Sequence, residues 1–271
     1  MVEVIIGIIQ EDFGINPHEN FEKIKTHIER NLKEADIILT PEYSMVNILK
    51  NLKPEDVYNL SEELENSSYL SKISDLSGKY SVNILTHFIE KTSSKPKCYN
   101  SSIIVKPSGS VEKVYSKLHL FDAYNYRESD FFNPGKSLSQ TILIKNKKFY
   151  TAICYDIRFP ELFRLYASRG AYGVFVQAGW VKSFLKEELL DILARSRSHE
   201  NTMYIVIANQ TGELYTGRSG VYNPYGFKEL DLGFKPKYCE YKLDLTIVDD
   251  AREQIPVVKQ ALEKWSIEFR F

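Results

Sequence analysis

The sequence has little that would mark a secreted or membrane protein. Its 271 residues contain only three cysteines, Cys98, Cys154 and Cys239, an odd number at wide spacing that makes a poor disulfide framework. No apolar run approaches the ~20 residues needed to cross a bilayer. The first residues, MVEVIIGIIQ, lack a basic region and a small-residue cleavage site, so they predict a strand and not a signal peptide. We therefore expect a soluble, cytoplasmic protein with reduced cysteines.

A large net charge of either sign is also lacking. The chain has 35 basic and 36 acidic residues, which gives a formal charge of −1. This balance argues against nucleic acid or an anionic membrane as a partner. The five histidines show neither a His-Glu-x-x-His motif nor cysteines at zinc spacing, so we expect no metal and no cofactor. A loop ending in Gly135-Lys136-Ser137 resembles a phosphate-binding loop, but Asp130 stands where that loop needs glycine.

What the sequence does contain is an alternation of strand-like and helix-like segments. The predicted strands are 2–9, 35–40, 82–89, 101–105, 173–177, 203–209, 220–223 and 238–245, with a hairpin over 141–153. The predicted helices are one that follows Asn16-Pro17, one or two over 54–76 closed by Gly78, 160–169 capped by Gly170, and 184–200. No linker or repeat divides the chain. We therefore predict one α/β domain over 1–271, strand-rich inside with helices outside, and a peripheral tail at 249–271.

Three reactive side chains stand where predicted strands end. Glu42 directly follows the strand 35–40, Lys117 ends another strand, and Cys154 ends the apolar run FYTAIC. Singly, each has an ordinary interpretation as a first solvated residue or an inert core thiol. However, open α/β folds place chemistry at the carboxyl ends of strands. Together the three residues provide a base, a cation and a nucleophile, which are the components of an acyl-transfer site.

The segments around these residues, TPEYS, YSKLHLFD and ICYDIRFPELFR, resemble the Glu, Lys and Cys motifs of the nitrilase superfamily of carbon–nitrogen hydrolases. The order of the motifs agrees, as does a Pro-Gly pair that follows the acidic Glu128. LARSRSHEN, IVIANQTG and SGVYNPYG are similar to later landmarks of the family, so the resemblance spans about residues 4–245. It implies a nitrilase-like α-β-β-α sandwich, usually a homodimer in which sheets and helices stack across the subunit interface.

The resemblance also implies roles for individual residues. Glu42 would be the general base and acid, Lys117 the transition-state stabiliser and Cys154 the nucleophile. The backbone N–H of Tyr155 would help Lys117 to stabilise the oxyanion. Glu128 matches an additional acidic residue of the family and would hold Lys117 and Glu42 in position, although the alternative of an ordinary exposed loop carboxylate has more weight for Glu128 than ordinary interpretations have for the other three residues.

The residues after the nucleophile indicate a branch of the superfamily. True nitrilases commonly have Trp-Glu after the cysteine, whereas this chain has Tyr155-Asp156 followed by Arg158-Phe159-Pro160-Glu161. That run is similar to the amidase branch with omega-amidases and deaminated-glutathione amidases, which implies hydrolysis of a small primary amide to a carboxylate and ammonia. We expect Arg158 to tie its loop to Glu161 or another acid.

Two segments depart from the family pattern where the pocket would be shaped. Residues 177–182 differ from the usual omega-amidase stretch, and Trp180 within them is either a pocket wall or an ordinary core or interface aromatic. Arg218 replaces the histidine of a Gly-His-Ser run found in many relatives. The natural substrate therefore stays open.

Three alternatives remain. The chain could be another enzyme of the superfamily, such as an N-carbamoyl hydrolase or a nitrilase. Cys154 and His119 could work as a pair in the manner of a cysteine protease. The chain could also be a catalytically silent relative that serves in binding or assembly, which the intact Glu42, Lys117 and Cys154 argue against. Cys98 and Cys239 have no comparable context.

Overall fold

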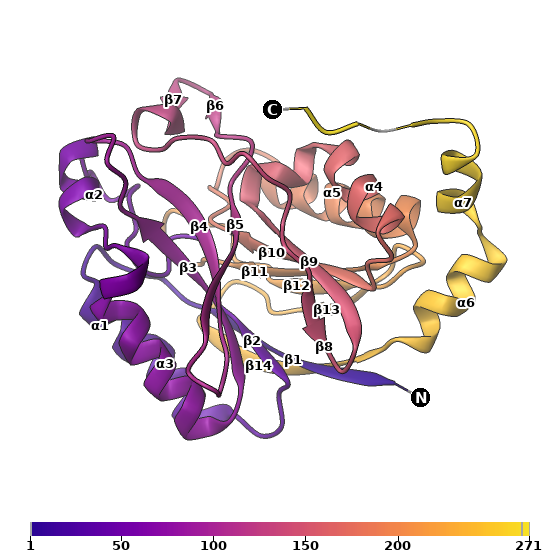
Figure 1. The fold of residues 1–271 in the computed structure, drawn as a ribbon, viewed down its shortest axis with the longest axis horizontal. Helices are drawn as coiled ribbons and strands as arrows, with labels where there is room; N and C mark the ends of the chain where they lie inside the picture. Colours follow the sequence, from indigo (N-terminus) through magenta and orange to yellow (C-terminus); the bar gives the residue numbers. More distant parts are fainter. Residues whose placement is uncertain (1, 267, 271) are drawn as a thin grey trace.

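Two six-stranded sheets form the centre of the protein, whose computed structural model describes residues 2–266 and 268–270 (Figure 1). The first sheet has the order β14-β1-β2-β3-β4-β5, with β1, β2 and β3 parallel and the outer pairs antiparallel. Its strands are β1 (Glu3–Gln10), β2 (Ile37–Leu39), β3 (Asn83–Glu90), β4 (Tyr99–Val105), β5 (Val111–Ser116) and β14 (Lys237–Asp244).

The second sheet has the order β13-β12-β11-β10-β9-β8, with β9, β10 and β11 parallel. Its strands are β8 (Ile142–Ile144), β9 (Lys147–Ile153), β10 (Gly173–Ala178), β11 (Tyr204–Asn209), β12 (Gly220–Tyr222) and β13 (Lys228–Asp231). A separate two-stranded pair, β6 (Asp122–Ala123) and β7 (Tyr126–Arg127), lies in the loop after β5.

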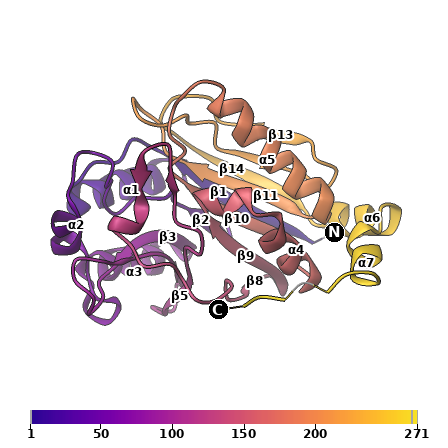
Figure 2. The same ribbon diagram turned by 90° about the horizontal axis from the view of Figure 1, so that it is seen from above.

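The two sheets pack face to face, and helices cover their outer faces (Figure 2). Alternate side chains of β1, such as Ile6 and Ile8, share one buried cluster with Phe149, Phe175 and Val206 of the second sheet. Because helices cover the opposite faces as well, the central strands are buried on both sides, which explains their nearly continuous apolar runs. The predicted α-β-β-α sandwich is confirmed.

Helices α1 and α3 lie on the first sheet, and α4 and α5 lie on the second (Figure 2). The helices are α1 (Pro17–Asn31), α2 (Pro54–Leu60), α3 (Ser68–Tyr80), α4 (Pro160–Ser168), α5 (Lys186–Asn201), α6 (Thr246–Gln254) and α7 (Val257–Leu262), with short 3-10 turns η1 (Leu64–Asn66), η2 (Glu128–Asp130) and η3 (Cys154–Arg158). The start predicted for α1 is correct, because the Asn16 side chain accepts hydrogen bonds from His18 N and Glu19 N.

Some predicted boundaries are wrong. Gly78 does not close its helix, because α3 continues to Tyr80 and the left-handed Ser81 (φ 52°) caps it with bonds to the carbonyls of Ser77 and Gly78. The strand β13 was not predicted, since its sequence KELD is polar and lies at a sheet edge, where no burial imposes an apolar pattern.

The end of the chain lies on the outside of the sandwich (Figure 1). Val248 and Ala251 of α6 are buried, and α7 packs against α4 and α5. Across residues 2–266 and 268–270, no helix has both the length and the apolar character needed to cross a membrane.

Candidate active site

The three predicted site residues meet at the carboxyl ends of strands from both sheets. Glu42 follows β2, Lys117 follows β5 and Cys154 follows β9, and all three line one pocket of about 370 Å³. Lys117 Nζ lies 2.8 Å from Glu42 Oε1. Since Glu42 belongs to the first sheet and Cys154 to the second, the packing of the sheets assembles this site.

Cys154 lies at a sharp turn between β9 and η3. Its φ of 45° is in the left-handed region, which non-glycine residues seldom adopt and which is frequent at functional sites. The residue is half-buried, and its thiol lies within hydrogen-bonding reach of the Glu42 carboxylate and the Gly179 N–H. Burial, and then the Glu42 carboxylate, raise the pKa of Cys154 well above its usual value. The resting sulfur is therefore a neutral thiol that needs a base to become a nucleophile.

Glu42 is buried, and neighbouring donors fix its orientation. Oε1 accepts bonds from Lys117 Nζ at 2.8 Å and Asn100 Nδ2 at 2.9 Å, and Oε2 accepts from Gly179 N at 3.0 Å. Burial raises the pKa of Glu42, Lys117 opposes that rise, and the Glu128 carboxylate adds to it. A carboxyl with a raised pKa beside a thiol is suited to accept and return a proton.

Lys117 is buried between two carboxylates. Its Nζ lies 2.8 Å from Glu42 Oε1 and 2.8 Å from Glu128 Oε2. Burial alone would lower the pKa of Lys117, but Glu128 and Glu42 hold that pKa well above its usual value. Lys117 is therefore a permanent, fixed cation at the pocket wall.

Glu128 is buried, so its interpretation as an exposed loop carboxylate is wrong. Besides Lys117, it accepts hydrogen bonds from Tyr43 Oη at 2.9 Å, Asn100 Nδ2 at 3.1 Å and Phe121 N at 2.6 Å. Tyr43 and Asn100 were not predicted as site residues. The one signal for Asn100 is its amide at the start of the apolar strand YNSSIIV, where a buried polar group needs partners.

The Pro-Gly pair after Glu128 has a steric reason. Gly135 N donates to the Lys117 carbonyl at 2.7 Å. A Cβ at Gly135 would lie 2.1 Å from the Ser116 carbonyl oxygen, which no side chain tolerates. The glycine therefore lets one loop pack against the backbone that carries Lys117.

Comparisons with known proteins identify the family. The family model for carbon–nitrogen hydrolases matches residues 7–246. The chain belongs to the carbon–nitrogen hydrolase family. It is 29% identical over 257 residues to the omega-amidase NIT3 of Saccharomyces cerevisiae, with 89% of this chain and 87% of that protein covered. It is 30% identical over 156 residues to the deaminated glutathione amidase of Escherichia coli O157:H7, with 58% and 60% covered.

Solved structures show the same fold. The NitFhit protein of C. elegans has a TM-score of 0.88 at 26% identity, over 99% of this chain and 67% of that one. The resemblance to the nitrilase superfamily is thereby confirmed, and relatives of the expected amidase branch are among the similar proteins.

The rest of the pocket of this carbon–nitrogen hydrolase is aromatic and cationic. Trp180 is part of both the pocket wall and the core cluster beneath α4 and α5. Its backbone N–H donates to Asn209 Oδ1 at 2.8 Å and its indole N–H donates to the Lys186 carbonyl at 2.9 Å. The other lining residues include Tyr155, Phe121, Tyr124, Tyr126, Arg158 and Lys186.

Two predictions about arginines are wrong. Arg158 does not bond Glu161, because within the described residues its buried Nε and Nη2 have no hydrogen-bond partner, and its guanidinium lies 4.9 Å from the Trp180 ring centroid. Arg218 does not shape the pocket. It lies outside the lining and bonds Asp231 of β13, Nε to Oδ2, at 2.7 Å.

His119 lies outside the pocket lining. Its Nδ1 is 2.7 Å from Asp156 Oδ1, and its ring stacks on Phe159 with centroids 3.5 Å apart. These contacts disfavour a pair of Cys154 and His119 in the protease manner.

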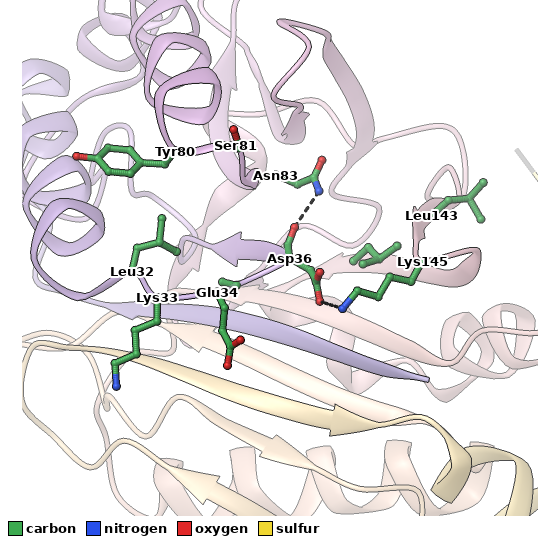
Figure 3. Close-up of a pocket in the computed structure, with 11 residues that line it drawn as sticks. Leu32, Lys33, Glu34, Asp36, Tyr80, Ser81, Asn83, Leu143 and Lys145 are labelled. Carbon is green, nitrogen blue, oxygen red and sulfur yellow. Dashed lines mark hydrogen bonds and ion pairs between the residues drawn. The ribbon is translucent and has the colours of Figure 1, made fainter. Parts of the chain in front are cut away.

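A second hollow lies at the other ends of β2 and β3 (Figure 3). Its polar contacts include Asp36 with Lys145, 2.7 Å apart, and the Asp36 carbonyl with Asn83 Nδ2, at 2.8 Å. No cysteine lines it. Cys98 is buried elsewhere and Cys239 is half-buried, and all three cysteines are unpaired thiols.

Proposed function

We propose that this chain hydrolyses a small primary amide with an anionic far end, through a thioester on Cys154. The observation that carries the proposal is the set of contacts among Cys154, Glu42 and Lys117, in which a neutral thiol, a carboxyl with a raised pKa and a permanent cation share one pocket wall. Residues of these types, held by buried hydrogen bonds, match the needs of nucleophilic acyl transfer.

In the first half-reaction, Glu42 takes the thiol proton as the Cys154 sulfur attacks the amide carbonyl carbon. The carbonyl oxygen becomes an oxyanion, which Lys117 and the backbone N–H of Tyr155 stabilise. When the tetrahedral adduct collapses, the C–N bond breaks, Glu42 returns its proton to the nitrogen, and ammonia leaves. The acyl group stays on sulfur as a thioester.

In the second half-reaction, a water molecule replaces the departed ammonia. Glu42 removes a proton from this water as its oxygen attacks the thioester carbonyl, and Lys117 again faces the oxyanion. Collapse breaks the C–S bond, Glu42 gives the proton to the sulfur, and the carboxylic acid is released. Glu42 thus acts twice as base and twice as acid, which suits a buried carboxyl with a raised pKa.

The cationic residues of the pocket lining support an anionic substrate. Arg158 has unpartnered guanidinium nitrogens, and Lys186 lies 4.4 Å from the Tyr124 ring centroid with no carboxylate partner among the described residues. Burial, and then the positive charge of Arg158, lower the pKa of Lys186. Among the described residues, Glu42 is the one acidic side chain in the lining, and it is already bonded to Lys117, so a ligand ammonium group would find no free carboxylate there. The name of the yeast relative, omega-amidase, agrees with a substrate of this class.

Replacing Arg158 by methionine is expected to change substrate preference. Since a charge-assisted hydrogen bond contributes about 1.5–3 kcal/mol, KM for succinamate should rise roughly 10- to 100-fold, and KM for butyramide, a neutral amide of the same length, should change little. The change in substrate preference is measured by ammonia release from both amides, and also from a carbamoyl amine and a nitrile. Lys182→Met, a lysine outside the lining, is the matched control. Equal losses for both amides would refute the anionic subsite.

Replacing Glu128 by glutamine is expected to shift the pH profile. Glu128 adds to the raised pKa of Glu42, so removing its charge lowers that pKa and keeps Glu42 ionised at more acidic pH. The acidic limb of kcat/KM should therefore move to lower pH. The maximum should fall roughly 10- to 100-fold, because Lys117 loses a positioning partner. Glu161→Gln, an exposed carboxylate nearby, should leave the profile unchanged. An unshifted limb in Glu128→Gln would contradict the proposed coupling.

A further inference from the structure

Asp156 is a fully buried carboxylate two residues after Cys154 that takes no part in the proposed chemistry and does not line the pocket. Its Oδ1 accepts bonds from His119 N at 3.0 Å and pairs with His119 Nδ1 at 2.7 Å. Its Oδ2 accepts from Tyr115 Oη at 2.8 Å and Ile153 N at 3.0 Å. No lysine or arginine pairs with it within the part of the chain that the structure describes.

These donors come from both halves of the site. Tyr115 and His119 stand two residues before and two residues after Lys117, and Ile153 directly precedes Cys154. A single carboxylate therefore joins the segment that carries the cation to the turn that carries the nucleophile. The backbone N–H of Lys117 itself donates to the Asn100 carbonyl at 2.8 Å. The segment is therefore fixed by Asn100 as well as by Asp156.

We propose that Asp156 and His119 form a positioning unit that sets the distance between Lys117 and the Cys154 sulfur. The bond from Ile153 N holds the start of the turn in which Cys154 adopts its left-handed φ of 45°, a conformation that needs support from its surroundings. His119 supplies two of the donors, and its ring is held by the stack on Phe159. This inference rests on the proposed function and adds two positioning residues, Asp156 and His119, which act through Lys117 and Cys154.

His119 is the better residue to change, because its side chain is about a third exposed, whereas loss of the buried Asp156 would leave several donors unpaired and threaten folding. Three substitutions separate its contacts. His119→Asn can keep a donor near the Nδ1 position but loses the stack, His119→Phe keeps the stack but loses the donor, and His119→Ala loses both. If the hydrogen bond to Asp156 positions Lys117, variants that keep the side-chain donor should keep activity, and variants that keep only the aromatic ring should lose it.

We expect kcat for succinamate to fall roughly 10- to 100-fold in His119→Ala and His119→Phe with little change in KM, and His119→Asn to recover most of kcat. The melting temperatures of the three variants, measured together with their kcat values, report any purely structural effect. Equal kcat in Ala, Phe and Asn variants, or losses that track melting temperature alone, would overturn the proposal. A His119→Asn variant as inactive as His119→Ala would also overturn it, because the hydrogen-bond donor would then not account for the loss.

A second measurement needs no substrate. The rate at which iodoacetamide alkylates Cys154 reports the environment of the sulfur, and we expect it to fall several-fold in His119→Phe and to be retained in His119→Asn. Rates that are identical in wild type and all variants would count against the positioning unit. Because this readout is independent of amide turnover, failure of the proposed function would appear as an inactive wild type with His119-dependent alkylation, a result distinct from failure of the unit.

Discussion

Replacing Cys154 by alanine is expected to lower amide turnover by about 10⁴-fold or more while the protein stays folded. The thiol is the one side chain in the pocket that can form the thioester, and neither Glu42 nor Lys117 replaces it. Cys154 is half-buried and its thiol is small, so loss of the thiol should change the melting temperature little. Steady-state ammonia release and a thermal melt measure the two effects.

The two other cysteines provide matched controls. Cys98 is buried and Cys239 is half-buried, and neither lines the pocket. Cys98→Ala and Cys239→Ala should therefore keep kcat within a small factor of wild type. Full activity in Cys154→Ala would end the proposed mechanism, and a comparable loss in Cys239→Ala would mean that the effect is not specific to the site.

Replacing Lys117 by methionine is expected to affect catalysis and stability together. Loss of one oxyanion donor typically lowers rates about 100- to 1000-fold, and Glu42 also loses its partner at 2.8 Å. The substitution leaves two buried carboxylates, Glu42 and Glu128, without their cation. Breaking a buried ion pair in this way costs about 3–5 kcal/mol of folding free energy.

The loss of stability in Lys117→Met should depend on pH. Burial and the Glu128 carboxylate already raise the pKa of Glu42, and without the opposing ammonium group that pKa lies further above its value in the unfolded chain. A group with a raised folded-state pKa favours folding at low pH, and that contribution is lost as the pH rises. Urea unfolding should therefore show a larger deficit against wild type at pH 8 than at pH 5. A loss of unfolding free energy that is the same at both pH values would contradict the charges assigned to Glu42 and Lys117.

The sequence-based predictions succeeded where a residue's neighbours along the chain determine its place. Apolar runs that stop at Glu42 and Cys154 mark strand ends, and parallel strands bring such ends to one edge, so the positions of these residues followed from local patterns. The sandwich followed from the resemblance, because alternation of strands and helices alone does not specify two face-to-face sheets.

Contacts made by distant, individually unremarkable residues could not be predicted. Tyr43 and Asn100 reach Glu128 only because both sheets are in place, and the Gly179 N–H that bonds Glu42 has no signature in its side chain. The expectation that Arg158 ties its loop to Glu161 or another acid is wrong, because the guanidinium at the end of the 3-10 turn η3 lies against the Trp180 ring. Charge pairing inferred from spacing fails where a short turn sets the direction of a side chain.

The central claim is that the acyl group passes through the sulfur of Cys154, and mass spectrometry of enzyme quenched with acid during turnover of succinamate tests it most directly. The account predicts a succinyl adduct on the peptide that contains Cys154, removed by hydroxylamine and missing from Cys154→Ala. Turnover at the wild-type rate with no adduct at any time after mixing, or with the adduct on another residue, would contradict it.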